Sequence, residues 1–397
     1  MSEPLRVFLV AGEASGDQLG AGLMRALRAR LAGRVSFAGV GGDAMEREGL
    51  ASLFPLADLA VMGIGAVVAR LPGLIRRGYT VVHAVTAARP DVLVVIDSPE
   101  FTHAVARRVR RRLPALPIVN YVSPSVWAWR PGRAPRMRAY IDHVLALKPF
   151  EPAAHARLGG PACTYVGHPL IERLSELRPG ADERPPLSAD PLPIVVLPGS
   201  RRSEIERLME PFGAALELFA AQSGRTLEVT LPAVPHLASE IRARAARWPV
   251  RPRIVEGEAE KYAAFRRAAL ALAASGTVTL ELALAGVPMV VGYKVSRLEE
   301  QLRFLIKVPS IVLANLILDE VVVPECVQWD CTPEKLAAAL LPLARETPER
   351  LRQLAAFARL DGIMEAGAPT TPSDRAAAIV AAQARLGRPD MPGRRGT

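Results

Sequence analysis

Cysteine is scarce in this chain: there are three, Cys163, Cys326 and Cys331, and none forms a CxxC pair. An odd number of cysteines without paired spacing excludes a disulfide framework and favours a reducing compartment. No stretch approaches the ~18 uninterrupted apolar residues of a transmembrane helix. The apolar stretch near the N-terminus is too short for a secretory signal peptide. We therefore expect a cytoplasmic protein whose contact with a membrane, if it has one, is peripheral.

Motifs for metals and dinucleotides are also missing. The sequence has no Asp-x-Asp pair to hold a metal beside a diphosphate, and its six histidines lack ligand spacing. No GxGxxG fingerprint occurs, and Gly39–Ala44 fits only the looser GxGxxA pattern, which is weak alone. We therefore expect neither a metal nor an organic cofactor.

The composition is rich in small and branched apolar residues. Hydrophobic residues make up 50% of the 397 residues and aromatic residues 5%, a balance typical of helices packed on parallel strands. The length suits two domains. The net charge of +10 suggests an acidic partner such as nucleic acid, anionic lipid or a phosphorylated substrate. A GC-rich genome that favours arginine explains much of this excess.

Two halves of the chain repeat one pattern of buried strands separated by helices. In the first half the expected strands are Arg6–Ala11, Val35–Val40, Asp91–Ile96, Ile118–Val122 and Val144–Leu147. After a stretch rich in proline and aspartate they are Ile194–Leu197, Thr226–Leu231, Arg253–Val255, Ala269–Ala274 and Pro288–Val291. Such alternation predicts parallel sheets covered by helices.

The predicted fold class is therefore α/β, with two Rossmann-like domains. Residues 1–177 form the first domain, 178–193 a linker, 194–360 the second domain, and 361–397 a C-terminal helix and frayed tail. We expect the last helices to cross back to the first domain. Ligands of such sheets bind at the carboxyl ends of strands, so the natural site is a cleft that both domains face.

Two turns of the second half have the form of phosphate sites. Leu197–Arg201 reads LPGSR between a strand and a helix, so glycine permits close backbone approach and the helix N-terminus favours an anion. Arg201 can add charge-assisted bonds. An ordinary turn with a surface arginine is about equally compatible with this motif.

The second turn begins at Ser275-Gly276-Thr277, and Glu281 follows one helical turn later on the same face. Thr277 can cap the helix or bind phosphate, and the Glu281 carboxylate can accept hydrogen bonds from both ribose hydroxyls. The alternative is a capping threonine and a solvated glutamate. Two phosphate-type turns in one domain make that alternative less attractive.

The first domain offers carboxylates beside a buried strand. Asp97 ends the strand and is the candidate general base, with Glu100 in reserve. A helix N-cap explains Asp97 nearly as well, because Ser-Pro-Glu follows it. His168 closes the domain and is more easily explained as a structural histidine than as a catalyst.

One apolar stretch and two basic runs stand out. Residues 61–82 are apolar with clustered arginines and are interrupted by Pro72. A core helix is the default. The sharper alternative is an interfacial segment whose bilayer-facing residues would be Val67, Val68, Leu71, Leu74 and Ile75. Arg107–Arg112 and Arg130–Arg138 are the basic runs. No nucleic-acid module accompanies them, so a solvated face, anionic lipid or phosphate is favoured over nucleic acid.

Several of these segments together resemble the lipid-A-disaccharide synthase family. In chain order they are VAGEASGD, LAVMGIGAV, PDVLVVIDSPEF, NYVSPSVWAWR, VGHPL, LPGSRRSEI, ASGTVTLELAL, PMVVGYK and NLILDEVVVPE. The match runs from about Val7 to Glu325. Pro324 stands where we expect a lysine-like residue.

The resemblance implies a glycosyltransferase B fold and an inverting, metal-independent transfer. The donor would be UDP-2,3-diacylglucosamine and the acceptor the 6-hydroxyl of 2,3-diacylglucosamine 1-phosphate. The products would be lipid A disaccharide 1-phosphate and UDP. Such enzymes act at the inner face of the cytoplasmic membrane, and homodimers occur among them.

The resemblance also suggests roles for matching residues. Asp97 would be the base. UDP would be held by Ser200, Arg201, Ser275, Gly276, Thr277, Glu281 and Asn315. The acceptor and donor sugar would be faced by Glu13, Ser15, Gly16, Asp17 and Ser123. The acyl chains would account for the apolar stretch, and the acceptor phosphate for arginines.

Two rival functions stay open at this point. A UDP-sugar 2-epimerase uses the same two-domain plan but needs no surface for acyl chains. A basic protein that binds nucleic acid or anionic membrane without catalysis leaves both phosphate-type turns and Glu281 unexplained.

Overall fold

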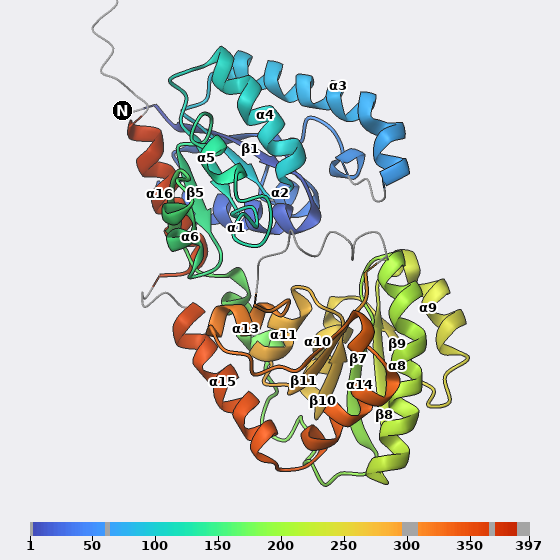
Figure 1. The fold of residues 1–397 in the computed structure, drawn as a ribbon. Coiled ribbons are helices and arrows are strands. Elements are labelled where there is room, and N and C mark those ends of the chain that lie inside the picture. The colour runs from blue at the N-terminus through green and yellow to red at the C-terminus, as the bar shows by residue number, and fades with distance from the viewer. Residues whose placement is uncertain (1–2, 60–63, 296–308, 365–369, 387–397) are drawn as a thin grey trace, which may run out of the picture. The chain divides into compact units, whose positions relative to one another are not determined.

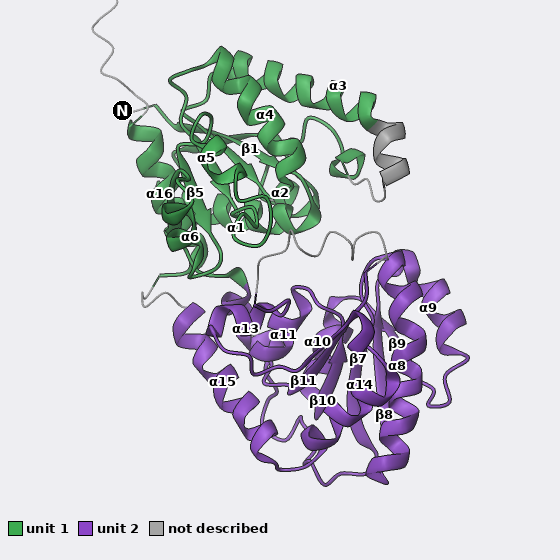
Figure 2. Ribbon diagram, viewed as in Figure 1, with its two compact units in different colours: residues 1–169, 365–397 green, residues 170–364 purple. Residues whose placement is uncertain are grey.

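The computed structural model describes residues 3–59, 64–295, 309–364 and 370–386 (Figure 1). The chain divides into two compact units (Figure 2). Unit 1 comprises Met1–Pro169 with Glu365–Thr397, and unit 2 comprises Leu170–Met364. Each unit contains a six-stranded parallel sheet with helices, in agreement with the predicted α/β class.

The sheet of unit 1 has the order β2-β1-β3-β4-β5-β6. Its strands are β1 (Leu5–Ala11), β2 (Val35–Val40), β3 (Val92–Ile96), β4 (Ile118–Tyr121), β5 (His143–Ala146) and β6 (Ala162–Tyr165). Its helices are α1 (Ala14–Arg30), α2 (Asp43–Arg47), α3 (Ile64–Ala88), α4 (Pro99–Arg112), α5 (Arg133–Met137), α6 (Glu151–Arg157) and α16 (Pro372–Leu386). Every residue of β3 is buried, because helices cover both faces of the sheet.

The sheet of unit 2 has the order β12-β11-β10-β7-β8-β9. Its strands are β7 (Leu192–Leu197), β8 (Leu227–Ala233), β9 (Arg253–Glu256), β10 (Leu270–Ala273), β11 (Met289–Tyr293) and β12 (Glu325–Val327). Its helices include α7 (Leu174–Leu177), α8 (Arg202–Ser223), α9 (Ala238–Ala245), α10 (Glu258–Arg267), α11 (Val278–Leu284), α13 (Leu313–Leu318), α14 (Pro333–Leu340) and α15 (Pro348–Met364).

In each sheet the chain order reverses between two central strands. The reversal lies between β1 and β3 in unit 1, and between β7 and β10 in unit 2. Ligands of open parallel sheets bind outside the carboxyl ends of the strands at such a switch point. The turns after these four strands are the ones that contain Gly12, Asp97, Gly199 and Gly276.

The boundary between the units lies at Pro169, earlier than residue 177, which the sequence predicted. The segment predicted as a linker at 178–193 belongs to unit 2, because arginines anchor it there. Arg178 donates to both carboxylate oxygens of Asp361 at 2.5 and 2.6 Å. Arg184 donates to the carbonyls of Ala285 and Gly286, each at 2.7 Å. Burial lowers the pKa of Arg184 to about 10.

The last helix returns to unit 1, as predicted, whereas α15 stays in unit 2. Helix α16 packs along α1, and Ala376, Ala377 and Val380 are buried in the core of unit 1. Arg375 donates to the carbonyl of Val166 at 2.7 Å. Buried small residues and this bond fix the final described segment to the sheet.

The start of α1 lies beside the candidate site. Helix α1 begins at Ala14. Glu13 has extended backbone and is the N-cap, so the helix starts one residue after it. Consequently Ser15, Gly16 and Asp17 belong to the first turn of α1, where their spacing is helical.

Candidate active site

The two phosphate-type turns of unit 2 lie next to each other. They follow the neighbouring strands β7 and β10, and the backbone N–H of Ala274 donates to the carbonyl of Leu197 at 2.7 Å. Gly199 has a φ of +116°, and a Cβ there would lie 2.4 Å from Oε2 of Glu204. Glycine is therefore required both by the backbone conformation and by the close approach of Glu204.

A pocket of about 480 Å³ opens at these turns. Six residues predicted to bind UDP line it: Ser200, Arg201, Ser275, Gly276, Thr277 and Glu281. They come from the loops after β7 and β10 and from helix α11, segments separated by about 80 residues of chain. The fold thus gathers into one cavity the residues that the sequence singled out separately.

Glu204 also lines this pocket and was missed by the sequence analysis. Its carboxylate accepts the backbone N–H groups of Ser200 at 2.9 Å and Arg201 at 3.1 Å. The Arg201 guanidinium also donates to it at 3.0 Å. Glu204 therefore accepts the backbone N–H groups of the turn that the sequence predicted as a site for a diphosphate. Its position at N3 of the helix is the signal of a capping box.

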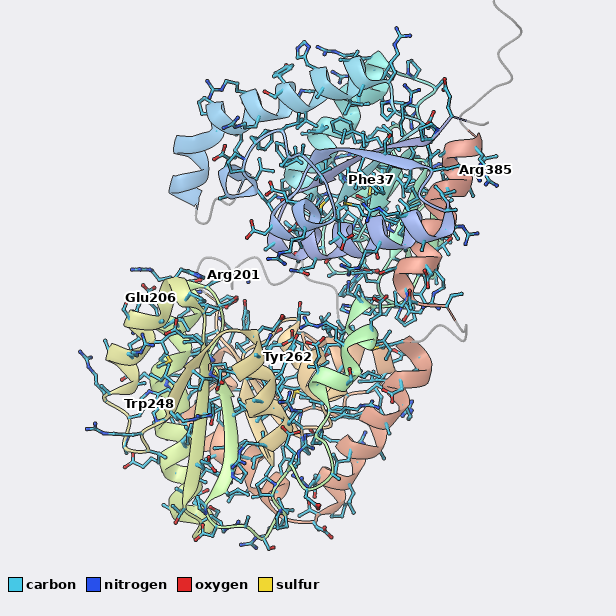
Figure 3. All side chains as sticks on the ribbon, turned by 180° about the vertical axis from the view of Figure 1, so that it is seen from behind. Phe37, Arg201, Glu206, Trp248, Tyr262 and Arg385 are labelled. Carbon is cyan, nitrogen blue, oxygen red and sulfur yellow. The ribbon has the colours of Figure 1, made fainter. Side chains whose placement is uncertain are left out.

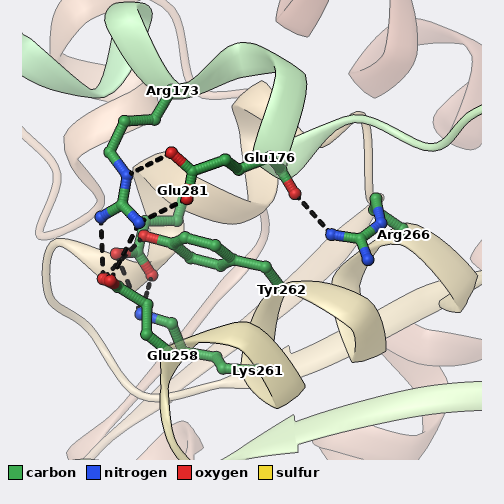
Figure 4. A network of polar contacts seen from close by, with 7 residues as sticks. All are labelled: Arg173, Glu176, Glu258, Lys261, Tyr262, Arg266 and Glu281. Carbon is green, nitrogen blue, oxygen red and sulfur yellow. Dashed lines mark hydrogen bonds and ion pairs between the residues drawn. The ribbon is translucent and has the colours of Figure 1, made fainter.

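Glu281 is held by a second missed residue, Lys261 of α10 (Figure 4). The Lys261 ammonium donates to both carboxylate oxygens at 2.9 and 3.1 Å, and Glu281 is 8% exposed. Lys261 lines the same pocket. A lysine that follows acidic residues on a predicted helix carries no distinctive signal, so only the fold reveals this pair.

Tyr262 joins the pair to a wider network (Figure 4). Lys261 and Arg173 lie over its ring at 4.7 and 4.9 Å from the centroid. Its hydroxyl donates to Glu258 at 3.1 Å, and Glu258 accepts from Arg173 at 2.9 Å. Burial, then the carboxylates Glu281 and Glu258, raise the pKa of Tyr262. The hydrogen bond from Arg173 lowers the pKa of Glu258. This network fixes one wall of the pocket.

Arg201 and Tyr262 lie at different places in unit 2, Arg201 just before helix α8 and Tyr262 within helix α10 (Figure 3). Arg201 precedes the first turn of α8, where its side chain is 66% exposed, whereas Tyr262 is 2% exposed. The guanidinium of Arg201 is therefore the exposed cation at the rim of the pocket, and Lys261 is the more buried cation.

Asn315 was predicted to lie beside the nucleotide, but the described lining of the pocket does not include it. Its amide is 2% exposed and donates to the carbonyl of Val323 at 3.0 Å and to Glu325 at 2.9 Å. Its carbonyl oxygen accepts the N–H groups of Val322 and Val323 at 3.0 and 2.9 Å. These bonds show Asn315 organising the loop before β12.

In unit 1, Asp97 stands at the carboxyl end of β3. Asp97 and Ser98 have φ values of +57° and +43°, a left-handed conformation that is uncommon for residues other than glycine and concentrates at functional sites. Oδ2 of Asp97 accepts the hydroxyl of Ser15 at 3.0 Å, and Oδ1 accepts the N–H of Ser98 at 2.8 Å. The half-buried carboxylate is thus oriented while keeping unused lone pairs.

Glu100, the reserve base, is held differently. Its side chain is 70% exposed, and Oε1 lies 2.7 Å from Arg133 and 3.6 Å from Arg130. Both guanidinium groups contact the same oxygen, Oε1. The exposed Glu100 carboxylate is thus ion-paired, whereas the half-buried Asp97 carboxylate has no ion pair among the described residues.

The first turn of α1 packs directly against Asp97-Ser98. A Cβ on Gly12 would lie 2.2 Å from that of Ser98, and one on Gly16 would lie 3.2 Å from the carbonyl of Ile96. Only residues without side chains allow this approach. Of the residues predicted to face sugar, Ser15 alone contacts Asp97 through a hydrogen bond in the described part of the chain.

Asp17 and Glu13 border a second cavity of unit 1, of about 910 Å³. Asp17 is 5% exposed and accepts the N–H groups of Gly42, Ala44 and Met45 at 2.8 to 3.0 Å. It therefore caps α2 and ties the turn after β2 to α1. Glu13 is exposed at the cavity.

Ser123 lies away from both cavities just described. It is 3% exposed, and its hydroxyl lies 2.9 Å from Nε2 of His155. Burial lowers the pKa of His155, so this imidazole is neutral at pH 7. The pair anchors the loop that contains Trp127.

Comparison with known proteins connects these features to a family. Residues 7–365 match the family model described as lipid-A-disaccharide synthetase. A lipid-A-disaccharide synthase of Nitrobacter hamburgensis is 57% identical over 376 residues, covering 94% of each chain. One of Bradyrhizobium diazoefficiens is 56% identical over 384 residues, covering 96% of this chain and 97% of the relative.

The chain belongs to the lipid-A-disaccharide synthase family. It is a glycosyltransferase with lipid-A-disaccharide synthase activity, which serves lipid A biosynthesis. The resemblance of the sequence motifs to this family is thereby confirmed.

Solved structures extend the match to the fold. UDP-GlcNAc 2-epimerase from Neisseria meningitidis has a TM-score of 0.61 at 13% identity, covering 97% of this chain and 100% of that one. MurG of Acinetobacter baumannii has a TM-score of 0.55 at 16% identity, covering 96% and 100%. At such identities the likeness shows the glycosyltransferase B-like fold alone. The epimerase that the sequence left as a rival therefore shares architecture, while the family match gives the activity.

Helix α3 contains the residues predicted to face a membrane. Leu71 and Ile75 are 47% and 46% exposed, and Leu74 is half-buried. The side chains of Val67 and Val68 lie outside the described residues. Helix α3 packs on α4, so one of its faces belongs to the core while Leu71 and Ile75 reach solvent. No helix in the described ranges is long and apolar enough to cross a bilayer.

Over the same described ranges, no cluster of three or more histidine, cysteine or carboxylate side chains is arranged to hold a metal. The cysteines Cys163, Cys326 and Cys331 are all free thiols. Burial raises the pKa of Cys163 to about 12 and of Cys331 to about 11. These thiols therefore remain protonated and unreactive at pH 7.

Proposed function

We propose that this family member transfers 2,3-diacylglucosamine from UDP-2,3-diacylglucosamine to the 6-hydroxyl of 2,3-diacylglucosamine 1-phosphate. The products are lipid A disaccharide 1-phosphate and UDP. One observation carries the proposal: two phosphate-type turns and a buried carboxylate converge on one pocket at the switch point of unit 2.

In this proposal unit 2 holds the UDP of the donor. The guanidinium of Arg201 and the ammonium of Lys261 attract the diphosphate and stabilise it as charge develops on the leaving group. Ser200, Ser275 and Thr277 supply hydroxyl groups around it. Glu281, kept in place by Lys261 at 2.9 Å, accepts hydrogen bonds from the ribose.

Unit 1 supplies the base. Asp97 takes the proton of the acceptor 6-hydroxyl while the oxygen attacks the anomeric carbon, and UDP leaves from the opposite face, so the configuration inverts. Ser15 orients the carboxylate through its 3.0 Å bond. In this proposal Arg201 and Lys261 stabilise the leaving diphosphate without a metal, and each also pairs with a carboxylate of the pocket, Glu204 and Glu281 respectively.

We also propose that the protein lies on the inner face of the cytoplasmic membrane through α3. Exposed Leu71 and Ile75 would enter the interface. Tyr79 lies nearby on the same helix, in a cavity that α4 lines with Arg107, Arg108, Arg111 and Arg112. Apolar side chains beside a basic surface favour a bilayer that contains anionic lipid.

Product analysis tests the reaction directly. The protein is incubated with UDP-diacylglucosamine, with and without diacylglucosamine 1-phosphate, in the presence of EDTA. We expect UDP and a β-1,6 disaccharide 1-phosphate only when the acceptor is present. A C2 epimer of the donor formed without acceptor would instead support the epimerase, and failure to form disaccharide would reject the transferase.

A further inference from the structure

Unit 1 contains a further cavity, whose lining includes neither Asp97 nor any residue of the donor pocket. It has a volume of about 470 Å³ and lies between α4 and the loop and helix around α5. Four arginines line it: Arg107, Arg130, Arg133 and Arg136. Glu100 is the only carboxylate in its described lining. A cavity with four guanidinium groups and one carboxylate has an excess of positive charge confined to a small space.

The arginines are spread around the cavity and held by different contacts. Arg133 and Arg130 lie 2.7 and 3.6 Å from the Glu100 carboxylate. Arg130 also stacks over Trp129 at 4.2 Å, and Arg107 lies over the ring of Tyr140 at 5.3 Å. Glu100 therefore acts as an internal counterion in this cavity, in the position that an external anion would take.

The floor of the cavity is a neutral, ordered chain of hydrogen bonds. Asn120 donates through Nδ2 to the carbonyl of Val122 at 2.9 Å, so its Oδ1 accepts from Nε2 of His103 at 3.1 Å. Nδ1 of His103 then accepts from the hydroxyl of Tyr140 at 3.2 Å. Burial, aided by the charges of Arg133 and Arg107, lowers the pKa of His103 to about 4. The positive charge of the cavity therefore comes from arginine alone at pH 7.

We propose that this cavity binds a phosphate monoester carried on a lipid, which under the proposed function is the 1-phosphate of the acceptor. Guanidinium groups match the geometry of phosphate oxygens and are the preferred ligands of such dianions. Pro99 and Glu100 line the cavity and follow Asp97 by two and three residues. An acceptor whose phosphate lies here presents its sugar beside the base.

The first test measures binding without turnover. The full chain is titrated with diacylglucosamine 1-phosphate, and separately with diacylglucosamine lacking the phosphate, both in detergent micelles. For the double variant Arg133→Ala/Arg136→Ala we expect the phosphorylated ligand to bind about 10- to 100-fold more weakly. The ligand without phosphate should bind wild type and variant alike. Equal binding of the phosphorylated ligand to both proteins would overturn the proposal.

Arg138→Ala is the matched control. Arg138 is an exposed arginine next to α5, two residues from Arg136, and is not among the residues that line the cavity. Its removal changes the net charge of the same surface without changing the cavity. We expect unchanged affinity, and a loss equal to that of Arg136→Ala alone would mean that only general electrostatic attraction is at work.

The variant Glu100→Gln distinguishes a phosphate site from a cluster of arginines that only stabilises the fold. Removing the internal counterion frees Arg133 and Arg130 for an external phosphate. We expect the affinity for the phosphorylated ligand to rise severalfold, and a fall would contradict the assignment of Glu100 as a competing anion.

Vesicles distinguish the source of the phosphate. Wild type and the double variant are compared on phosphatidylcholine vesicles with and without phosphatidic acid. Weaker micellar binding of the acceptor assigns the cavity to the substrate, while loss of vesicle binding alone assigns it to a membrane headgroup. If the double variant binds both the micellar acceptor and the vesicles as wild type does, the proposed site is rejected. If the site binds phosphate and no disaccharide forms in the product assay, the proposed function fails and this inference stands.

Discussion

The two units have the same kind of sheet but place different chemistry at its carboxyl edge. In unit 2 the switch point is lined by glycine turns, Arg201, Lys261 and a buried Glu281 around one pocket. In unit 1 it presents Asp97 in a left-handed backbone conformation, with a basic cavity on the neighbouring helix. Under the proposed function the same scaffold would bind the donor in unit 2 and supply the base in unit 1, and the difference arises in a few loop residues.

The units also differ in their buried titratable groups. Burial lowers the pKa of four histidines in unit 1, to about 4 for His103 and about 3 for His168, and downward for His143 and His155. The single histidine of unit 2 is His236. There the shifted side chains include exposed glutamates such as Glu258, whose pKa is lowered by its hydrogen bond with Arg173 rather than by burial.

The largest expected effect is on kcat and comes from changing Asp97, the proposed base of unit 1. Asp97→Asn should lower kcat about 100- to 10,000-fold, because the amide accepts no proton from the acceptor hydroxyl. The KM for the donor should change little. Steady-state kinetics with Glu100→Gln as the comparison checks this, since we expect the larger loss of kcat at Asp97. A larger loss at Glu100 would transfer the role of base to it.

The sequence predicted the repeated parallel-sheet pattern and the residues after the central strands, because buried strands and glycine turns leave local signals. It predicted poorly whatever depends on partners distant in the chain. Lys261, for example, pairs with Glu281 from another helix. The short edge strands β6 and β12 also escaped notice, since a half-exposed strand of three or four residues has little pattern.

Acid should unfold unit 1 before unit 2. An unfolded histidine binds a proton near pH 6.5, whereas folded His103 does so only near pH 4. Between these values the unfolded state holds more protons, so stability falls as the pH drops from 6.5 to 4, by about 3 kcal/mol for His103. The lowered pKa of Glu258 acts on unit 2 only below about pH 4.5. Hydrogen exchange of peptides from each unit at pH 7.5 and 5 measures the difference; equal loss of protection would remove this contrast.

A smaller effect should follow from changing the rim of the donor pocket. Arg201→Ala should raise the KM for the UDP donor about 10- to 100-fold, the expected loss of a charge-assisted contact with phosphate. Arg202→Ala is the control, because Arg202 is 69% exposed and pairs with Glu240 at 3.5 Å. Equal KM values for the two variants would show that Arg201 acts only through general charge.

The smallest effect concerns the surface of α3. Leu71→Glu/Ile75→Glu should weaken binding to anionic vesicles severalfold without lowering the thermal unfolding temperature, since both side chains are about half exposed. Leu386→Glu, at a position 77% exposed on α16, is the matched control. Cosedimentation that does not distinguish the two variants would exclude α3 as the membrane-facing surface.

The division of labour between the units is tested most directly by calorimetric titration of UDP into wild type, Asp97→Asn and Glu281→Gln. We expect wild-type UDP affinity for Asp97→Asn and an affinity about tenfold lower for Glu281→Gln, which loses a charged acceptor for the ribose hydroxyls. Weaker UDP binding by Asp97→Asn, or unchanged UDP binding by Glu281→Gln, would contradict the assignment of UDP to unit 2 and of the base to unit 1.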